Sequence, residues 1–263
     1  MIDQKTFIND LHKIRENAPL IHNITNYVVM NSTANALLSI CASPVMAHAS
    51  GEIDDRVAMG GALVVNMGTL SEKWIEAMHL AGKAAKRNGK PVILDPVGAG
   101  ATSLRTNATK SIIETIKPQV IRGNASEILA IAQASMTTKG VDSTASAEEA
   151  IEIAQTFAKQ AGAVISISGK TDYITDGKTV NKVTNGHKLM GNITGTGCTA
   201  TALTGAFAAV TDDYLTAATE AMLAMGIAGE MAAEEADAPG TFQVKFLDAI
   251  YKLNEEEIKK RMK

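Results

Sequence analysis

Six short apolar runs, separated by segments with helical spacing, constrain the fold of this chain more than any other feature of its sequence. The runs lack the polar alternation of a half-exposed strand, so they fit strands that are covered on both faces. Segments 72–87 and 145–159 place apolar residues at the spacing of an amphipathic helix. This alternation predicts βαβ units around a mainly parallel sheet, which is an α/β fold. The predicted strands are residues 20–24, 45–47, 63–67, 92–94, 120–121 and 164–167.

The pattern changes in the last third of the chain. Residues 173–175 and 178–183 flank Asp176 and Gly177, an arrangement typical of a β-hairpin. From Cys198 onward we expect helices: one rich in small residues, an Ala- and Met-rich segment over 214–236, and a charged, solvated end over 255–263. The Ala- and Met-rich segment fits a buried helix, the default interpretation, or an oligomer contact. No linker rich in Pro, Gly or Ser divides the sequence, so we predict a single domain over residues 1–263.

Composition excludes several classes of partner. Hydrophobic residues make up 46% of the 263 residues, which is enough for a large core. The formal charge is −3 and no basic cluster occurs, so a nucleic-acid partner is not expected. The chain has no apolar run of about 20 residues and no signal-peptide pattern, so we expect no membrane association and a cytoplasmic location. The two cysteines, Cys41 and Cys198, are then expected to be free thiols.

Gly195, Thr196, Gly197 and Cys198 precede the small-residue helix and form the sharpest candidate site. Two glycines let a turn close tightly over a ligand, and a helix that opens directly afterwards points free N–H groups at it. Such a turn is a seat for an anion, above all phosphate. The alternative is a plain strand-to-helix turn, because a motif this short also occurs without a ligand.

Polar residues follow several predicted strands, where ligands of open α/β sheets bind. Asp95 ends one run and could face a metal-bound phosphate, although an aspartate before Pro96 also orders turns. Ser168 ends another run and could donate to a phosphate or ribose oxygen, although serines are common in turns. The residues themselves leave both alternatives open.

Arg122, Asn124 and Glu127 follow a third predicted strand. The guanidinium of Arg122 could bind nucleotide phosphate through paired donors, and Glu127 could hold Mg²⁺ through water. The same residues also fit a capping box, with Asn124 as N-cap and Glu127 at the third helical position. The two interpretations are compatible.

Near the N-terminus, His22, Asn23 and Asn26 form a polar cluster, followed later by Met46. Asn23 and Asn26 could orient a small ligand, and the Met46 thioether could pack against a flat heterocycle, although methionine more often fills core gaps. We assign no chemistry to His22, His48 or His187, because no His/Cys spacing here resembles a zinc site.

Together these motifs resemble the hydroxyethylthiazole kinases of thiamine salvage, over nearly the whole chain. The resemblance implies a ribokinase-like three-layer fold, with a mainly parallel central sheet flanked by helices. It also implies ATP as co-substrate, Mg²⁺, a thiazole alcohol as substrate, and a homotrimer whose active sites lie between neighbouring subunits. The motifs that carry it are residues 22–29, 31, 34–35, 43–46, 66–69, 94–100, 122–128, 186–187 and 195–198.

The resemblance also implies roles for single residues. It assigns substrate contacts to Met46 and Gly195, with Asn23 rather than Tyr27 as a further contact. It assigns ATP contacts to Arg122 and Ser168, and Mg²⁺ and phosphate to Asp95 and Glu127. Cys198 matches the position of the catalytic base, and residues 195–198 match the anion hole. This sequence departs from the family pattern at two positions: Cys41, where a small glycine-like residue is expected, and Lys188, where a proline is usual.

A thiol is an unusual group at the position of a base. Its reference pKa is about 8.5, so Cys198 is neutral near pH 7 unless the helix N-terminus lowers that pKa, which the turn could do. A loose phosphoryl-transfer transition state requires little early proton removal, so positioning by a thiol could suffice.

Other functions share part of the pattern. A pyrimidine or other vitamin-precursor kinase of the same fold would share Asp95, Glu127 and the phosphate turn, and an ADP-dependent hydrate-repair lyase could use the same nucleotide seat. The lyase would lack the signature of residues 22–31. An NAD-dependent oxidoreductase does not fit, because no Gly-x-Gly-x-x-Gly follows a strand with an acidic residue about 20 positions later. A noncatalytic binding protein would leave the combination of Asp95, Glu127 and Cys198 unexplained.

Overall fold

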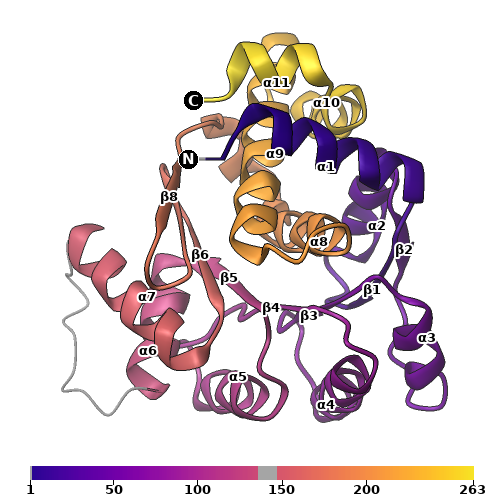
Figure 1. The fold of residues 1–263 in the computed structure, drawn as a ribbon, viewed down its shortest axis with the longest axis vertical. Coiled ribbons are helices and arrows are strands. Elements are labelled where there is room, and N and C mark those ends of the chain that lie inside the picture. Colours follow the sequence, from indigo (N-terminus) through magenta and orange to yellow (C-terminus); the bar gives the residue numbers. More distant parts are fainter. Residues whose placement is uncertain (1, 136–146) are drawn as a thin grey trace.

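A single sheet forms the centre of the computed structural model, which describes residues 2–135 and 147–263. Within those residues eight strands pair in the order β2-β1-β3-β4-β5-β6-β7-β8 (Figure 1). Strands β1 to β6 are parallel, and β7 and β8 continue the sheet in antiparallel fashion. The predicted α/β fold is therefore confirmed. The strands are β1 (Leu20–Ile24), β2 (Ser43–Val45), β3 (Ala62–Asn66), β4 (Val92–Asp95), β5 (Val120–Asn124), β6 (Val164–Ser168), β7 (Asp172–Thr175) and β8 (Val180–Val183).

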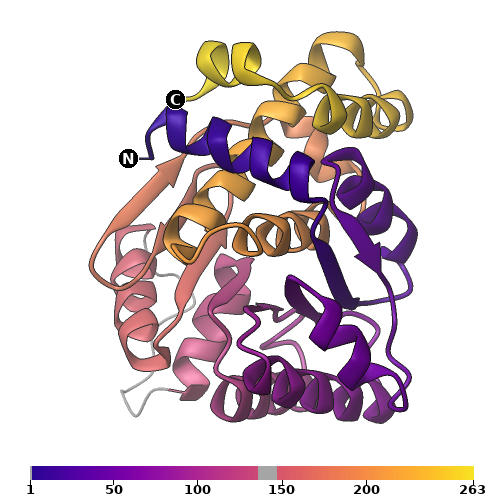
Figure 2. The same cartoon turned by 45° about the vertical axis from the view of Figure 1, so that its right-hand side comes forward.

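Helices cover both faces of the sheet and complete three layers. One face carries α3 (Ile53–Met59), α4 (Glu72–Arg87), α5 (Ser103–Ile116), α6 (Ala125–Ser135) and α7 (Ala147–Ala161). The other carries α1 (Gln4–Asn17), α2 (Met30–Ser39), α8 (Thr196–Ala208), α9 (Tyr214–Glu235), α10 (Pro239–Lys252), α11 (Glu255–Arg261) and the short 3-10 helix η1 (Lys188–Asn192). On this face α8 and α9 pack directly on strands, and α1, α10 and α11 lie outside them (Figure 1, Figure 2).

The ends of two strands differ from the prediction, because backbone pairing rather than apolar character sets where these strands begin and end. Strand β2 begins at Ser43, two residues before the predicted run, because Leu20 pairs with Ser43 in the ladder. Strand β5 continues to Asn124, which pairs with Ser168 of β6. Arg122 and Asn124, predicted to follow this strand, thus belong to its last positions. Residues 145 and 146, the predicted start of the helix that becomes α7, lie outside the described residues.

The antiparallel end of the sheet confirms the predicted hairpin. Asp176 Oδ1 accepts hydrogen bonds from the N–H groups of Lys178 (2.8 Å) and Thr179 (2.7 Å), and Gly177 has φ 89°. Aspartate and glycine are therefore both used for turn chemistry.

The C-terminal helix α11 is mostly exposed, as its charge pattern predicted, but two of its residues are buried. Ile258 is fully buried, and Arg261, which is 9% exposed, pairs with Glu234 at 2.8 Å. A guanidinium can be buried when carboxylates accept its hydrogen bonds. The local sequence pattern does not reveal this pairing. No helix in the described ranges has the length and apolar character needed to cross a bilayer.

Small residues bring α8 unusually close to the sheet. A Cβ on Gly205 would lie 2.8 Å from Val64 Cγ2 and 3.2 Å from Ile21 Cγ2. The helix is buried from Thr199 to Ala208. Most of α9 is also buried, which agrees with core burial as the default expectation for the Ala- and Met-rich segment. This close contact sets the N-terminus of α8 beside the carboxyl ends of the central strands.

Cys41 occupies a backbone conformation that favours glycine. Its φ is 72°, just beyond α2, and the next N–H, that of Ala42, bonds to the Leu37 carbonyl at 2.8 Å. A left-handed residue at this place ends many helices, and it is usually glycine because a Cβ is unfavourable there. The departure at position 41 therefore has a conformational cost.

We predict that Cys41→Gly increases the free energy of unfolding by about 1 kcal/mol, because it relieves the left-handed strain. Urea unfolding should show a higher midpoint with an unchanged slope. Cys41→Ala is the matched control, since it removes the thiol and keeps the Cβ. Equal midpoints for the two variants would contradict the explanation.

Candidate functional site

The carboxyl ends of six parallel strands meet at one edge of the sheet. Strand β1 lies between β2 and β3, so the chain reverses its direction of travel across the sheet there. Ligands of open α/β sheets bind outside the carboxyl ends near such a point. In the register, Asn66 at the end of β3 pairs with Asp95 at the end of β4. The candidate site is built on these ends and on the N-terminus of α8.

A chain of buried hydrogen bonds links Asp95 to Cys198. Asp95 Oδ2 accepts from Asn66 Nδ2 (2.9 Å) and from Thr201 Oγ1 (2.8 Å). Asn66 Oδ1 accepts from Asn26 Nδ2 (2.8 Å), and the same Nδ2 lies 3.6 Å from Cys198 Sγ. The thiol and the carboxylate, predicted separately from the sequence, are therefore brought into one connected group.

Asp95 is a carboxylate whose ionised form is poorly solvated. Burial raises its pKa to about 6, and the nearby charge of Glu127 acts in the same direction. The charge of Arg122 and the hydrogen bonds from Thr201 and Asn66 oppose the shift. Such a group is ionised at neutral pH yet gains strongly from a cation, since a cation would replace the lost solvation.

Cys198 has the opposite shift to the one that the helix N-terminus was expected to provide. Burial raises the pKa of its thiol to about 11, and the charge of Asp95 raises it further, while hydrogen bonds from Asn66 and Asn26 act to lower it. Desolvation of this half-buried thiol is the largest cause of the shift. Cys198 is therefore a neutral thiol near pH 7.

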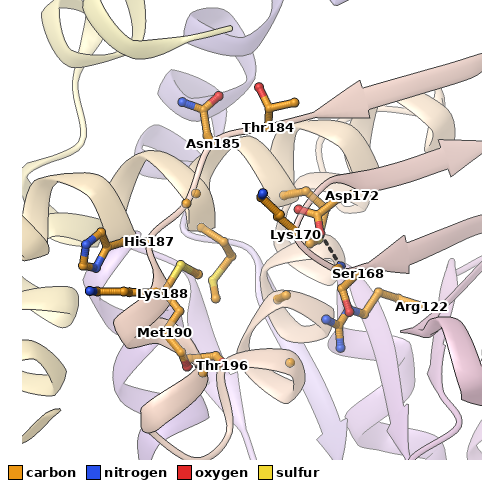
Figure 3. Close-up of a pocket in the computed structure, with 18 residues that line it drawn as sticks. Arg122, Ser168, Lys170, Asp172, Thr184, Asn185, His187, Lys188, Met190 and Thr196 are labelled. Carbon is orange, nitrogen blue, oxygen red and sulfur yellow. Dashed lines mark hydrogen bonds between the residues drawn. The ribbon is translucent and has the colours of Figure 1, made fainter. Parts of the chain in front are cut away.

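A cleft of about 660 Å³ opens beside this group (Figure 3). It lies between the β6–β7 turn, the segment after β8, and helices α8 and α9, and it is lined by Arg122, Ser168, Thr196 and Gly197. A volume of this size suits a small-molecule ligand. The structure thus brings together the predicted nucleotide contacts and the middle of the predicted anion hole.

Arg122 approaches the first turn of α8 across a glycine. A Cβ on Gly197 would lie 2.7 Å from Arg122 Nη1, so a larger residue would displace the guanidinium. Arg122 is 7% exposed, and its buried Nε has no hydrogen-bond partner among the described residues. A buried donor without a partner is costly, and an anion in the cleft would relieve that cost.

The N-terminus of α8 has the geometry of an anion seat. Gly195 is the N-cap with φ 86°, and the first intrahelical bond runs from Thr199 N to the Gly195 carbonyl at 2.8 Å. The N–H groups of residues 196–198 belong to the first turn and have no intrahelical acceptor. They are free to donate to an anion.

Glu127 forms the predicted capping box. Asn124 Oδ1 accepts from Glu127 N (2.9 Å), and Glu127 Oε2 accepts from Asn124 N (2.9 Å). Its other oxygen, Oε1, accepts from Gly98 N at 2.8 Å. Each oxygen keeps one lone pair, so the cap leaves room for a hydrogen bond to a metal-bound water.

The carboxylates of Asp95 and Glu127 suit Mg²⁺ better than a cation whose ligands must all come from the protein. Within residues 2–135 and 147–263 no cluster of three or more His, Cys, Asp or Glu side chains could hold a metal ion. Asp95 Oδ1 takes no hydrogen bond from those residues and is a free ligand atom. Mg²⁺ commonly binds one or two carboxylates together with water and phosphate oxygens, which matches this donor set.

The predicted contacts for the second ligand lie away from the cleft. Asn23 is buried in β1, where its Nδ2 donates to the Ile21 carbonyl (2.9 Å) and its Oδ1 has no partner. Met46, directly after β2, is half-buried against the core. Gly195 faces Val29 at the N-cap of α8 rather than the cleft. None of these residues lines the cleft.

The histidines and Lys188 have structural explanations. His22 Nε2 bonds to the Ala47 carbonyl at 2.8 Å, and burial lowers the pKa of its ring. His48 packs 3.8 Å from the Trp74 ring, and His187 Nδ1 accepts from Leu189 N. Lys188 is the first residue of η1, a position where proline is favoured because its fixed φ suits a helix start.

Sequence reasoning missed three site residues. Asn66 and Thr201 both bind Asp95, and Asp172 lines the cleft, where its Oδ1 accepts from Gly169 N (2.9 Å) and burial raises its pKa to about 6 (Figure 3). Asn66 carried a usable signal, since it ends an apolar run just as Asp95 does. Thr201 and Asp172 had none, because their positions depend on helix docking and on the turn after β6.

Comparisons with known proteins agree with this arrangement. The model of the hydroxyethylthiazole kinase family matches residues 11–256. A hydroxyethylthiazole kinase from Leptospira biflexa serovar Patoc is 53% identical over 258 residues, covering 98% of this chain and 97% of that protein. One from Desulfotalea psychrophila is 52% identical over 255 residues, covering 97% and 93%. The solved structure of a hydroxyethylthiazole kinase from Pyrococcus horikoshii OT3 superimposes with a TM-score of 0.92 at 44% identity, covering 98% of each chain.

Proposed function

Because this chain belongs to the hydroxyethylthiazole kinase family, we propose that it transfers the γ-phosphoryl group of ATP to the hydroxyl of 4-methyl-5-(2-hydroxyethyl)thiazole, a step of thiamine salvage in the cytoplasm. The observation that carries the proposal is the junction of a 660 Å³ cleft with the first turn of α8, the turn that also contains Cys198. The family match over most of the chain favours this activity over the pyrimidine kinase and the hydrate-repair lyase.

In the proposed complex ATP occupies the cleft with its terminal phosphates toward α8. Arg122 and the hydroxyl of Ser168 donate to the nucleotide, and the free N–H groups of residues 196–198 donate to the oxygens of the transferring phosphoryl group. Donors that are already fixed stabilise charge in the transition state without further ordering. The small size of Gly197 supports this arrangement, since it leaves space for the guanidinium beside those N–H groups.

Asp95 would bind Mg²⁺ through its free Oδ1, and Glu127 would hold a water on the ion. The ion supplies neutralisation of phosphate charge when it is bound. Asn66 and Thr201 keep Asp95 oriented by donating to its other oxygen. Glu127 has a fixed position because both of its oxygens accept backbone N–H groups.

Cys198 would orient the substrate alcohol rather than deprotonate it early. With its pKa at about 11, the thiol is neutral near pH 7, and its sulfur accepts a hydrogen bond from the alcohol. The alcohol oxygen forms the new bond to phosphorus as the bond to the β-phosphate oxygen breaks, and the alcohol proton passes late to solvent water. Met46, Gly195 and Asn23 would surround the thiazole ring.

The direct test mixes purified protein with Mg-ATP and hydroxyethylthiazole and identifies the product by mass spectrometry. We expect the thiazole phosphate and ADP, with no product when EDTA removes the metal. The parallel substrates are a hydroxymethylpyrimidine and hydrated NADH. Preferential phosphorylation of the pyrimidine, or dehydration of the NADH hydrate, would replace the proposed activity with one of the alternatives.

We predict that Cys198→Asp keeps or increases turnover and that Cys198→Ala retains measurable activity. An aspartate with a reference pKa of about 3.9 is a stronger acceptor for the alcohol proton, whereas alanine leaves the phosphate donors in place. Steady-state kinetics at saturating ATP measures both variants. An alanine variant that folds and binds ATP but has no activity would make the thiol indispensable and reject this mechanism.

We also propose a homotrimer in which a neighbouring subunit completes the thiazole pocket. Its support is a group of exposed apolar side chains beside β1 and β2: Tyr27 is 65% and Val28 is 62% exposed, and Leu38 and Met59 are similarly open. Burying such side chains against another copy would stabilise the assembly. This edge is also where Met46 and Asn23 lie.

Sedimentation equilibrium is expected to give the mass of three 27.6 kDa chains. Val28→Glu should dissociate the assembly and raise KM for the thiazole more than KM for ATP. The control is Val244→Glu, which places the same charge at a residue of similar exposure, 61%, on α10. A monomeric wild-type protein with full activity would contradict the shared pocket.

A further inference from the structure

The side-chain amides of Asn26 and Asn66 are buried and lie between the sulfur of Cys198 and the carboxylate of Asp95. In the proposed mechanism their only role so far is that Asn66 orients Asp95. Asn66 is 1% and Asn26 is 4% exposed, so neither side chain is solvated by bulk water. They come from different elements: Asn66 ends β3, and Asn26 lies in the loop after β1. Together they connect the two groups that would handle the alcohol and the metal.

The orientation of the Asn66 amide is determined by its surroundings. Its Oδ1 accepts two N–H groups, from Asn26 Nδ2 (2.8 Å) and Gly68 N (2.9 Å), and its Nδ2 donates to Asp95 Oδ2 (2.9 Å). A flipped amide would set a donor against two donors and an acceptor against a carboxylate. Only one orientation satisfies all three contacts.

Asn26 is oriented in the same way. Its Oδ1 accepts from Val28 N at 3.1 Å, which directs its Nδ2 toward Asn66 and toward Cys198 Sγ at 3.6 Å. Gly68 packs against this side chain so closely that a Cβ there would overlap it. The sulfur therefore receives an N–H from a group that cannot turn away.

We propose that Asn26 and Asn66 are positioning residues, forming a rigid amide bridge that holds the Cys198 sulfur in place relative to Asp95 and supplies it with an N–H donor. The donor occupies one side of the sulfur and leaves the other side to meet the substrate alcohol. The effect of the amide bridge on catalysis rests on the proposed kinase function, whereas the existence of the bridge does not depend on that function.

The reactivity of the thiol separates this role from a merely structural one. An N–H donor stabilises the thiolate, so its removal should slow alkylation of Cys198 by making the thiolate rarer. If the amides only fill space, their removal opens the site and the thiol should be alkylated faster. The two explanations therefore predict changes of opposite sign.

The experiment measures the alkylation rate of Cys198 by iodoacetamide across pH 7 to 10, in a Cys41→Gly background that leaves Cys198 as the only cysteine. The variants are Asn26→Ala, Asn66→Ala and the double substitution, together with Asn26→Asp, which keeps the shape and the acceptor for Val28 N. The control is Asn181→Ala, a buried amide that bonds to Thr219 at 3.1 Å away from the site. Circular dichroism confirms folding of each variant.

We expect Asn26→Ala to slow alkylation at pH 8.5 by roughly tenfold, the effect of losing one hydrogen bond to a charged group. Asn26→Asp should slow it further, because a carboxylate beside the sulfur opposes the thiolate. The double variant should be little worse than either single variant, since the bridge fails when one member is lost. Asn181→Ala should leave the rate unchanged.

The kinetic arm measures kcat and KM. Loss of positioning should lower kcat by roughly tenfold in each bridge variant and leave KM for ATP within about twofold. Faster alkylation in Asn26→Ala and Asn26→Asp, or strictly additive effects in the double variant, would overturn the bridge. If the protein did not phosphorylate the thiazole, alkylation would still test the bridge, so the two failures remain distinguishable.

Discussion

The close packing of α8 against the centre of the sheet is the constraint on which the rest of the site depends. Gly205 permits contact with Val64 and Ile21, and about two turns earlier Gly197 permits contact with Arg122. With a larger residue at either place the helix would have to move outward. Thr201 would then lose Asp95, and the free N–H groups of the first turn would no longer face the strand ends. Small side chains along this helix are thus a geometric requirement.

The site contains several polar groups whose burial lowers the free energy of unfolding. Asp95 is a buried carboxylate, Arg122 keeps an unpartnered Nε, and the first turn of α8 has free donors. Each of these costs would fall when an anion and a cation are bound, because the missing partners are then supplied. The apolar clusters on both faces of the sheet stabilise the fold enough to offset the cost of burying these polar groups. Affinity for ligand therefore has the same origin as the energetic cost of burying these groups.

The sequence alone predicts the layers of the fold and the strand-end residues Asp95, Arg122 and Ser168, because parallel strands collect their carboxyl ends at one edge. It does not predict the partners of these residues. Asn66 meets Asp95 through the register between β3 and β4, and Thr201 meets it through the docking of a helix more than a hundred residues away. The sequence left the direction of the Cys198 pKa shift open for a related reason, since desolvation depends on packing that no local motif encodes.

The buried thiol bears on how such a protein survives oxidants. Peroxides react with the ionised sulfur, and a cysteine with its pKa at about 11 is ionised in roughly one molecule in ten thousand at pH 7. A cysteine activated by the helix end would have been a ready target for conversion to sulfenic acid and beyond. Keeping the sulfur protonated gives up nucleophilic strength that phosphoryl transfer to an alcohol does not need, and it lowers the reactivity of the sulfur toward peroxides.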